Sequence, residues 1–187
     1  MRKFDPQKMA RYETENYVAY YQRDWLRLLR ASIGLIKETF GLNWRQAAYG
    51  AYLVARAEIA FAPYPKNDIL RAENFMRRFY AFIRRVHREE FDVAQAARLE
   101  VNWWSIHRRL FGNPQNQELV DALTDIYALA YGVAPARVRT AAFHRAQGML
   151  YSDYWVTQGK QPDSLLLVQE EQELFQAYTA LHAAISA

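Results

Sequence analysis

Residues 93–111 read VAQAARLEVNWWSIHRRLF, and this stretch decides how the rest of the chain is interpreted. At about 100° per residue, an α-helix places Glu100 and His107 only about 20° apart on one side. That side is also the most apolar one, because Trp103 and Trp104 lie around it. A carboxylate and an imidazole in the middle of a buried face need partners. The stretch therefore predicts an interior helix that carries polar side chains.

Segments with the same helical periodicity lie on both sides of this stretch. None of them shows the period-two alternation of a half-buried strand, and glycine or proline separates most of them. We therefore predict an all-α, single-domain bundle of about seven helices over residues 1–187, with residues 1–11 as a loose leader. The expected helical segments other than 93–111 are 12–40, 47–62, 69–90, 118–131, 135–156 and 164–184.

Segment 47–62 differs from the others because it is apolar nearly all the way round. Such a pattern is typical of a helix that is enclosed on every side. Pairs of alanines recur near the starts of three helices at similar separations, at residues 47–48, 96–97 and 141–142. The recurrence suggests three degenerate helix–turn–helix repeats.

Composition limits the classes of function. The net charge of +4 and the pI of about 9.3 permit an acidic partner without requiring one, because arginine is spread along the whole chain. The absence of cysteine excludes disulfides, thiolate metal sites and cysteine nucleophiles. No apolar run reaches the roughly 20 residues that a membrane span needs, and the first residues do not resemble a signal peptide. We expect a cytoplasmic protein.

The candidate site is a set of charged residues that helical spacing places in the interior. Our first interpretation is a charge-matched network that fixes helix packing in a non-catalytic accessory or interaction protein. No cofactor is expected, and this interpretation allows a protein partner or self-association. General acid–base catalysis in a closed pocket is an alternative. The predicted interior residues are Arg56, Glu58, Glu100, His107, Arg145 and Asp153.

A second interpretation is a metal-dependent, oxidase-like protein with iron, manganese or zinc. Glu100 and His107, with Glu73 upstream, resemble part of the ligand pattern of haem-oxygenase-like diiron oxidases. That resemblance implies an all-α diiron site. The chain departs from the pattern because no aspartate is followed four residues later by histidine. The ligands in this interpretation are Glu58, Glu100, His107 and Asp153.

A third interpretation is a binding module for an acidic polymer. The helix at 69–90 places several arginines on one side, opposite its apolar residues. We expect this side to be a solvated surface, since no aromatic residue interleaves with its arginines and nucleic-acid binding is therefore not favoured. The residues of this arginine face are Arg77, Arg78, Arg84, Arg85 and Arg88.

Overall fold

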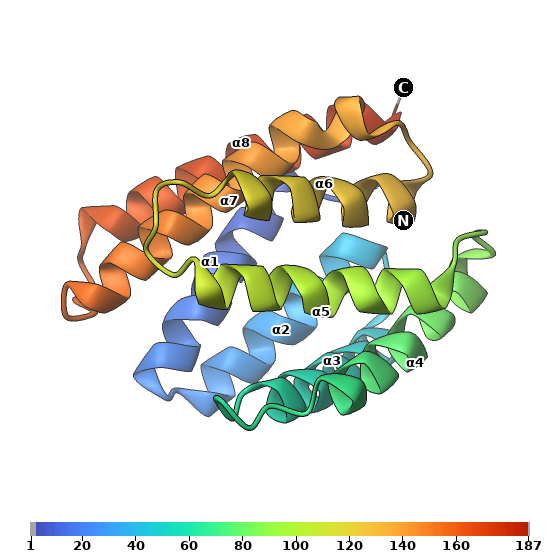
Figure 1. The fold of residues 1–187 in the computed structure, drawn as a ribbon, viewed down its shortest axis with the longest axis horizontal. Coiled ribbons are helices and arrows are strands. Elements are labelled where there is room, and N and C mark those ends of the chain that lie inside the picture. Colours follow the sequence, from blue (N-terminus) through green and yellow to red (C-terminus); the bar gives the residue numbers. More distant parts are fainter. Residues whose placement is uncertain (1–2, 187) are drawn as a thin grey trace.

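The computed structural model describes residues 3–186, and this part of the chain contains eight α-helices and no strand (Figure 1). The predicted all-α class and single bundle are confirmed, with one helix more than expected. None of these helices is both long and apolar enough to cross a membrane. The helices are α1 (Pro6–Gln22), α2 (Trp25–Phe40), α3 (Trp44–Phe61), α4 (Ile69–His87), α5 (Val93–Arg109), α6 (Gln117–Tyr131), α7 (Pro135–Thr157) and α8 (Leu165–Ser186).

The eight helices form a closed ring. Each helix packs against the next one in the sequence, and α8 returns to pack against α1. Figure 1 shows α5 and α6 on one side of the molecule, with α1 and α2 behind them. Every helix therefore turns one side toward the middle of the ring and another toward solvent. This arrangement decides where the site lies.

The additional helix arises because the expected segment 12–40 is two helices. Arg23 adopts the left-handed conformation (φ 60°) and ends α1. Asp24 then caps α2 by accepting a hydrogen bond from the backbone N–H of Arg27 (3.1 Å). The predicted leader at 1–11 is also corrected, because α1 begins at Pro6. Residues 1 and 2 lie outside the described part of the chain.

The amino-terminal segment is held in place by burial. Phe4, Met9 and Ala10 are all buried in the core. Asp5 caps α1, and its own backbone N–H donates to Glu38 Oε1 of α2 (2.8 Å). A leader without these contacts would have remained loose, and periodicity cannot reveal such contacts.

Helix α3 is not enclosed on every side. Trp44, Tyr52 and Ile59 fall on one side of this helix, and all three are exposed. The physical reason is the ring, in which α2 and α4 flank α3 and its outer side has no neighbour. The alanine pairs lie near helix starts as expected, but the three-unit repeat stays a prediction.

Candidate functional site: a central cavity with an acidic lining

The middle of the ring contains a cavity of about 320 Å³, to which all eight helices contribute side chains. Its size lies at the lower end of the range for small-molecule pockets, which is about 300–1,000 Å³. Most of the lining is apolar, and aromatic rings are prominent in it. The rings include those of Phe40, Phe79, Phe91, Trp103 and Trp104.

Two carboxylates, Glu58 of α3 and Glu100 of α5, line this cavity. Glu100 Oε2 accepts a hydrogen bond from the hydroxyl of Tyr80 (2.6 Å). Burial and the charge of Glu100 raise the pKa of the Tyr80 hydroxyl well above its usual value. Tyr80 therefore stays protonated as a donor, and Glu100 is the acceptor.

The side-chain carboxylate of Glu58 has no hydrogen bond or ion pair with any residue between 3 and 186. Burial, followed by the charge of Glu100, raises the pKa of Glu58 to about 7. Glu58 lies deep among protein atoms, yet its side chain is exposed, as is that of its cavity neighbour Ala55. The cavity therefore reaches solvent beside α3. Glu58 is therefore an acidic group with a pKa near neutrality that contacts water. Among the described residues, no cation pairs with its carboxylate.

A second group of polar residues surrounds Arg145 of α7. Its guanidinium forms an ion pair with Glu13 of α1 (3.0 Å) and donates to the hydroxyl of Tyr127 (3.3 Å). Glu13 also accepts a hydrogen bond from Tyr178, and the guanidinium lies over the ring of Trp103. Burial alone would lower the pKa of Arg145, but the charge of Glu13 raises it above its usual value. Arg145 is therefore a fixed cation that Glu13 already neutralises.

A third group is centred on Asp153, which is 2% exposed. Its Oδ2 lies 3.2 Å from His107 Nε2 and accepts the backbone N–H of Gly112 (2.9 Å), while its Oδ1 accepts the hydroxyl of Tyr17 (2.9 Å). Burial and the charge of Asp153 raise the pKa of Tyr17. Asp153 thus joins α1, α5 and the loop after α5 to α7.

One more carboxyl group, Glu170 of α8, lines the cavity and is 1% exposed. Its Oε2 has no hydrogen-bond partner among the described residues. Burial raises the pKa of Glu170 well above its usual value, which favours the uncharged form of this group. The indole N–H of Trp103 is likewise buried and without a partner in residues 3–186.

The structure separates the predicted interior residues into different environments. Glu58 and Glu100 face the same cavity, and His107 contacts Asp153 rather than Glu58. Arg145 pairs with Glu13, and Glu100 takes a tyrosine hydroxyl instead of a guanidinium as its nearest partner.

Arg56 differs most from its expected interior position. It lies on the outer side of α3, where it covers the rings of Tyr52 and Phe75 and donates to the Tyr52 hydroxyl. Its long side chain lets the charge remain in water while the carbon chain covers aromatic surface.

The donors of the metal interpretation do not form a ligand set. Within residues 3–186, no group of three or more histidine, aspartate or glutamate side chains is arranged to hold a metal ion. Asp153 is already occupied by three donors, and Glu58 does not approach His107 as a ligand partner. The arginine face lies on the surface of α4, where Arg77, Arg78, Arg84, Arg85 and Arg88 are all exposed.

Sequence reasoning missed several residues of the site. Glu13 fell next to the end of the predicted leader, so its place on an interior helix side was not recognised. Tyr80 and Tyr127 were not singled out, because a tyrosine in a periodic pattern does not reveal where its hydroxyl points. Glu170 offered one usable signal: it lies four residues before Leu174 and shares that apolar side of α8.

Fold and site together define a ring of eight helices around a cavity of ligand size. No family model, no curated protein and no solved structure matches this chain. Its function is therefore inferred from the chemistry of the cavity.

Proposed function

We propose that this protein is a non-catalytic accessory protein that binds a small organic cation in its central cavity. The observation that supports the proposal is the charge of the lining, which contains four glutamates and one arginine. The chain as a whole has the opposite charge, +4. Because Arg145 is neutralised by Glu13 and burial favours the uncharged form of Glu170, Glu58 and Glu100 remain to attract a cation. The four glutamates are Glu13, Glu58, Glu100 and Glu170.

Aromatic rings around these carboxylates favour an amine over a hydrated metal ion. Ring faces attract ammonium groups electrostatically, most strongly when both are removed from water. Trp103, Trp104 and Phe91 line the cavity together with Glu58 and Glu100. A ligand with one ammonium group and an apolar body would pair with the carboxylates and fill the remaining space. An acceptor oxygen on such a ligand would also satisfy the indole N–H of Trp103.

The serines of the cavity support a binding role rather than acyl-transfer chemistry. Ser32 and Ser152 both line the cavity, and both donate to backbone carbonyls of their own helices. His107 is directed to Asp153, which also holds Tyr17. A nucleophile of this class needs a base within hydrogen-bond reach. Neither serine has a histidine as its partner.

The proposal retains the cytoplasmic location and the macromolecular partner that the sequence predicts. An accessory protein acts through another molecule, so a macromolecular partner is part of this proposal. The predicted repeat is compatible with this proposal. Glu58 and His107 fall ten residues after Ala48 and Ala97, and Asp153 falls eleven residues after Ala142. Glu58 and His107 line the cavity, and Asp153 contacts His107.

Calorimetric titration with 2-phenylethylamine tests this proposal, with the uncharged 2-phenylethanol as the matched control ligand. We expect the amine to bind and to raise the melting temperature, and the alcohol to bind at least tenfold more weakly. In Glu58→Gln the preference for the amine should fall, whereas Glu90→Gln, which changes an exposed carboxylate, should behave like the parent. Equal binding of amine and alcohol would overturn the proposal.

The pH dependence of amine binding is a second test of the proposed function. Glu58 must be ionised to pair with an ammonium group, and its pKa in the empty protein is about 7. The affinity should therefore be constant above about pH 7 and fall by about tenfold per unit below it. Glu58→Gln should lose this dependence. An affinity that does not change between about pH 5 and 8 would contradict a role for Glu58.

A further inference from the structure

Charge is divided unevenly along the chain, although arginine occurs throughout it. Residues 23–88, which form α2, α3 and α4, contain thirteen lysines and arginines but only five acidic residues, a net charge of +8. The rest of the chain has a net charge of −4. These three helices are neighbours in the ring, so the excess of positive charge is also local in space.

The same helices expose large apolar side chains. Helix α2 is strongly amphipathic, yet Ala31 is its only buried residue. The exposed side chains begin at the first residues of α2 and continue along the outer side of α3. We call these residues the α2–α3 face: Trp25 (62% exposed), Leu26 (59%), Leu29 (54%), Trp44 (66%), Tyr52 (49%) and Ile59 (66%).

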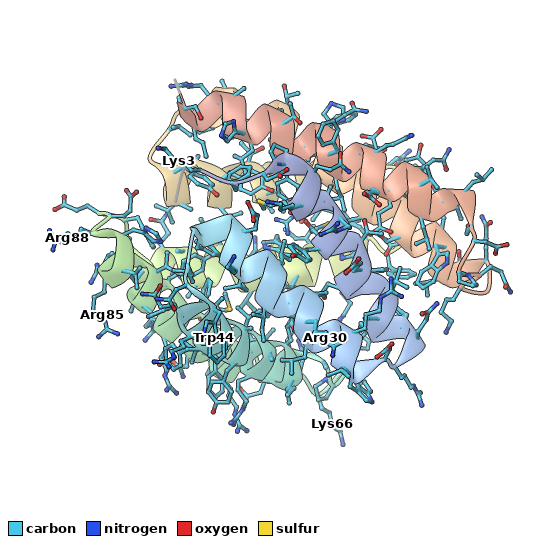
Figure 2. All side chains as sticks on the ribbon, turned by 180° about the vertical axis from the view of Figure 1, so that it is seen from behind. Lys3, Arg30, Trp44, Lys66, Arg85 and Arg88 are labelled. Carbon is cyan, nitrogen blue, oxygen red and sulfur yellow. The ribbon has the colours of Figure 1, made fainter. Side chains whose placement is uncertain are left out.

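Basic residues interleave with the α2–α3 face. Arg45 lies over the ring of Trp44, and Arg56 lies over the ring of Tyr52. On α2, Arg30 and Lys37 are one and three turns beyond Leu26 on its outer side. Figure 2 shows Arg30, Trp44 and Lys66 projecting from the surface that α2 and α3 present in that view.

We propose that the α2–α3 face docks on the surface of a membrane that contains anionic phospholipid. Interfacial helices combine basic residues, which attract phosphate and carboxylate headgroups, with tryptophan and leucine, which enter the headgroup–acyl boundary. The α2–α3 face combines tryptophan and leucine side chains with neighbouring basic residues. Its positive charge is complementary to an anionic leaflet. No helix of residues 3–186 spans a membrane, so the association is peripheral.

The charge also argues against a second copy of the chain as the occupant. A two-fold symmetric dimer through this face would place two surfaces of the same positive sign against each other. A nucleic acid is a weaker candidate than a membrane, because Leu26, Leu29 and Ile59 have no aromatic plane on which a base would stack. Hydrocarbon, in contrast, accepts aliphatic side chains.

The full-length protein can be tested by co-sedimentation with vesicles of phosphatidylcholine, alone or mixed with phosphatidylserine. Binding should require phosphatidylserine and weaken as salt is added. The triple variant Arg30→Gln/Lys37→Gln/Arg45→Gln should bind these vesicles on the order of a hundredfold more weakly, about fivefold for each charge removed. The control Arg98→Gln/Arg137→Gln/Arg139→Gln loses the same charge from exposed positions of α5 and α7 and should bind like the parent.

A second measurement reports insertion of the face. Brominated phosphatidylcholine mixed with phosphatidylserine should quench tryptophan fluorescence in the parent and much less in Trp25→Leu/Trp44→Leu. Circular dichroism of each variant establishes that it is folded. Absence of binding to anionic vesicles, an equal loss in the control variant, or preferential binding of a single-stranded RNA over the vesicles would overturn the proposal.

Discussion

At the scale of single residues, burial decides which charges need protein partners and which do not. Asp153 is enclosed and has three donors, two of them side chains from other helices. The carboxylate of Glu58 keeps contact with water and has no donor among residues 3–186. A buried charge without partners is unstable, so the enclosed aspartate is the one that must be neutralised by the fold.

The importance of Asp153 can be measured by removing it. Asp153→Ala leaves the Tyr17 hydroxyl, the Gly112 N–H and His107 without their acceptor, so we expect it to lower the free energy of unfolding by about 3 kcal/mol. Urea denaturation measures this difference. Asp163→Ala changes an exposed residue in the loop before α8 and should cost less than about 0.5 kcal/mol. Equal effects of the two substitutions would contradict the proposed network.

At the scale of helices, α1 and α2 show how close packing overrides local preference. Gly34 interrupts an otherwise good helical pattern and reads as a weak point of α2. In the structure it lets α1 approach, because a Cβ built at Gly34 would lie 2.6 Å from a ring carbon of Tyr12. Glycine at this position therefore leaves room for the Tyr12 ring of the neighbouring helix, although it costs helix stability.

Substitution of Gly34 separates the effect of the close Tyr12 ring from the effect of glycine on helix stability. Gly34→Ala should lower the free energy of unfolding by about 1–2 kcal/mol, because the methyl group displaces the Tyr12 ring. In the background of Tyr12→Ala the same substitution should instead stabilise the protein by about 0.5–1 kcal/mol, the usual advantage of alanine over glycine in a helix. Thermal or urea unfolding of the four proteins completes the cycle. A stabilising Gly34→Ala in the parent would show that Tyr12 moves freely.

At the scale of the whole molecule, the ring separates an acidic cavity lining from the basic outer sides of three helices. The outer sides of α2, α3 and α4 have excess positive charge, whereas the cavity lining has excess negative charge. The two sets of charges lie on opposite sides of one helix layer, so they do not neutralise each other through direct contact. The acidic lining remains available to a cation, and the basic outer surface remains available to an anionic partner.

Not every arginine on the exterior belongs to the α2–α3 face. Arg78 contacts Phe75, which Arg56 of α3 also covers, so this side of α4 borders the face. Arg77, Arg84 and Arg88 lie on other sides of α4 or at its end and are exposed. Arg77→Gln/Arg84→Gln/Arg88→Gln should keep the fold and change the free energy of unfolding by less than about 1 kcal/mol. A large loss in urea denaturation would show that these arginines stabilise the ring.

Helical periodicity and local signals were sufficient to predict most helices. Gly41 ends α2 in the left-handed conformation, Asp68 caps α4, and Pro135 begins α7, as the sequence indicates. These signals act over one or two turns, which is why they can be read from neighbouring residues. The break at Arg23 has no glycine or proline to mark it. It depends on a non-glycine residue that adopts a positive φ.

The sequence by itself determined which residues are charged on apolar helix sides, and so it identified Glu58, Glu100, His107 and Asp153. Only the tertiary structure decided how they are paired, because each pairing joins two different helices. The packing of the helices placed Glu13 against Arg145, Tyr80 against Glu100, and the outer side of α3 in solvent. A residue's helical angle states which side it is on, whereas the neighbour on that side is set by the packing of the other seven helices.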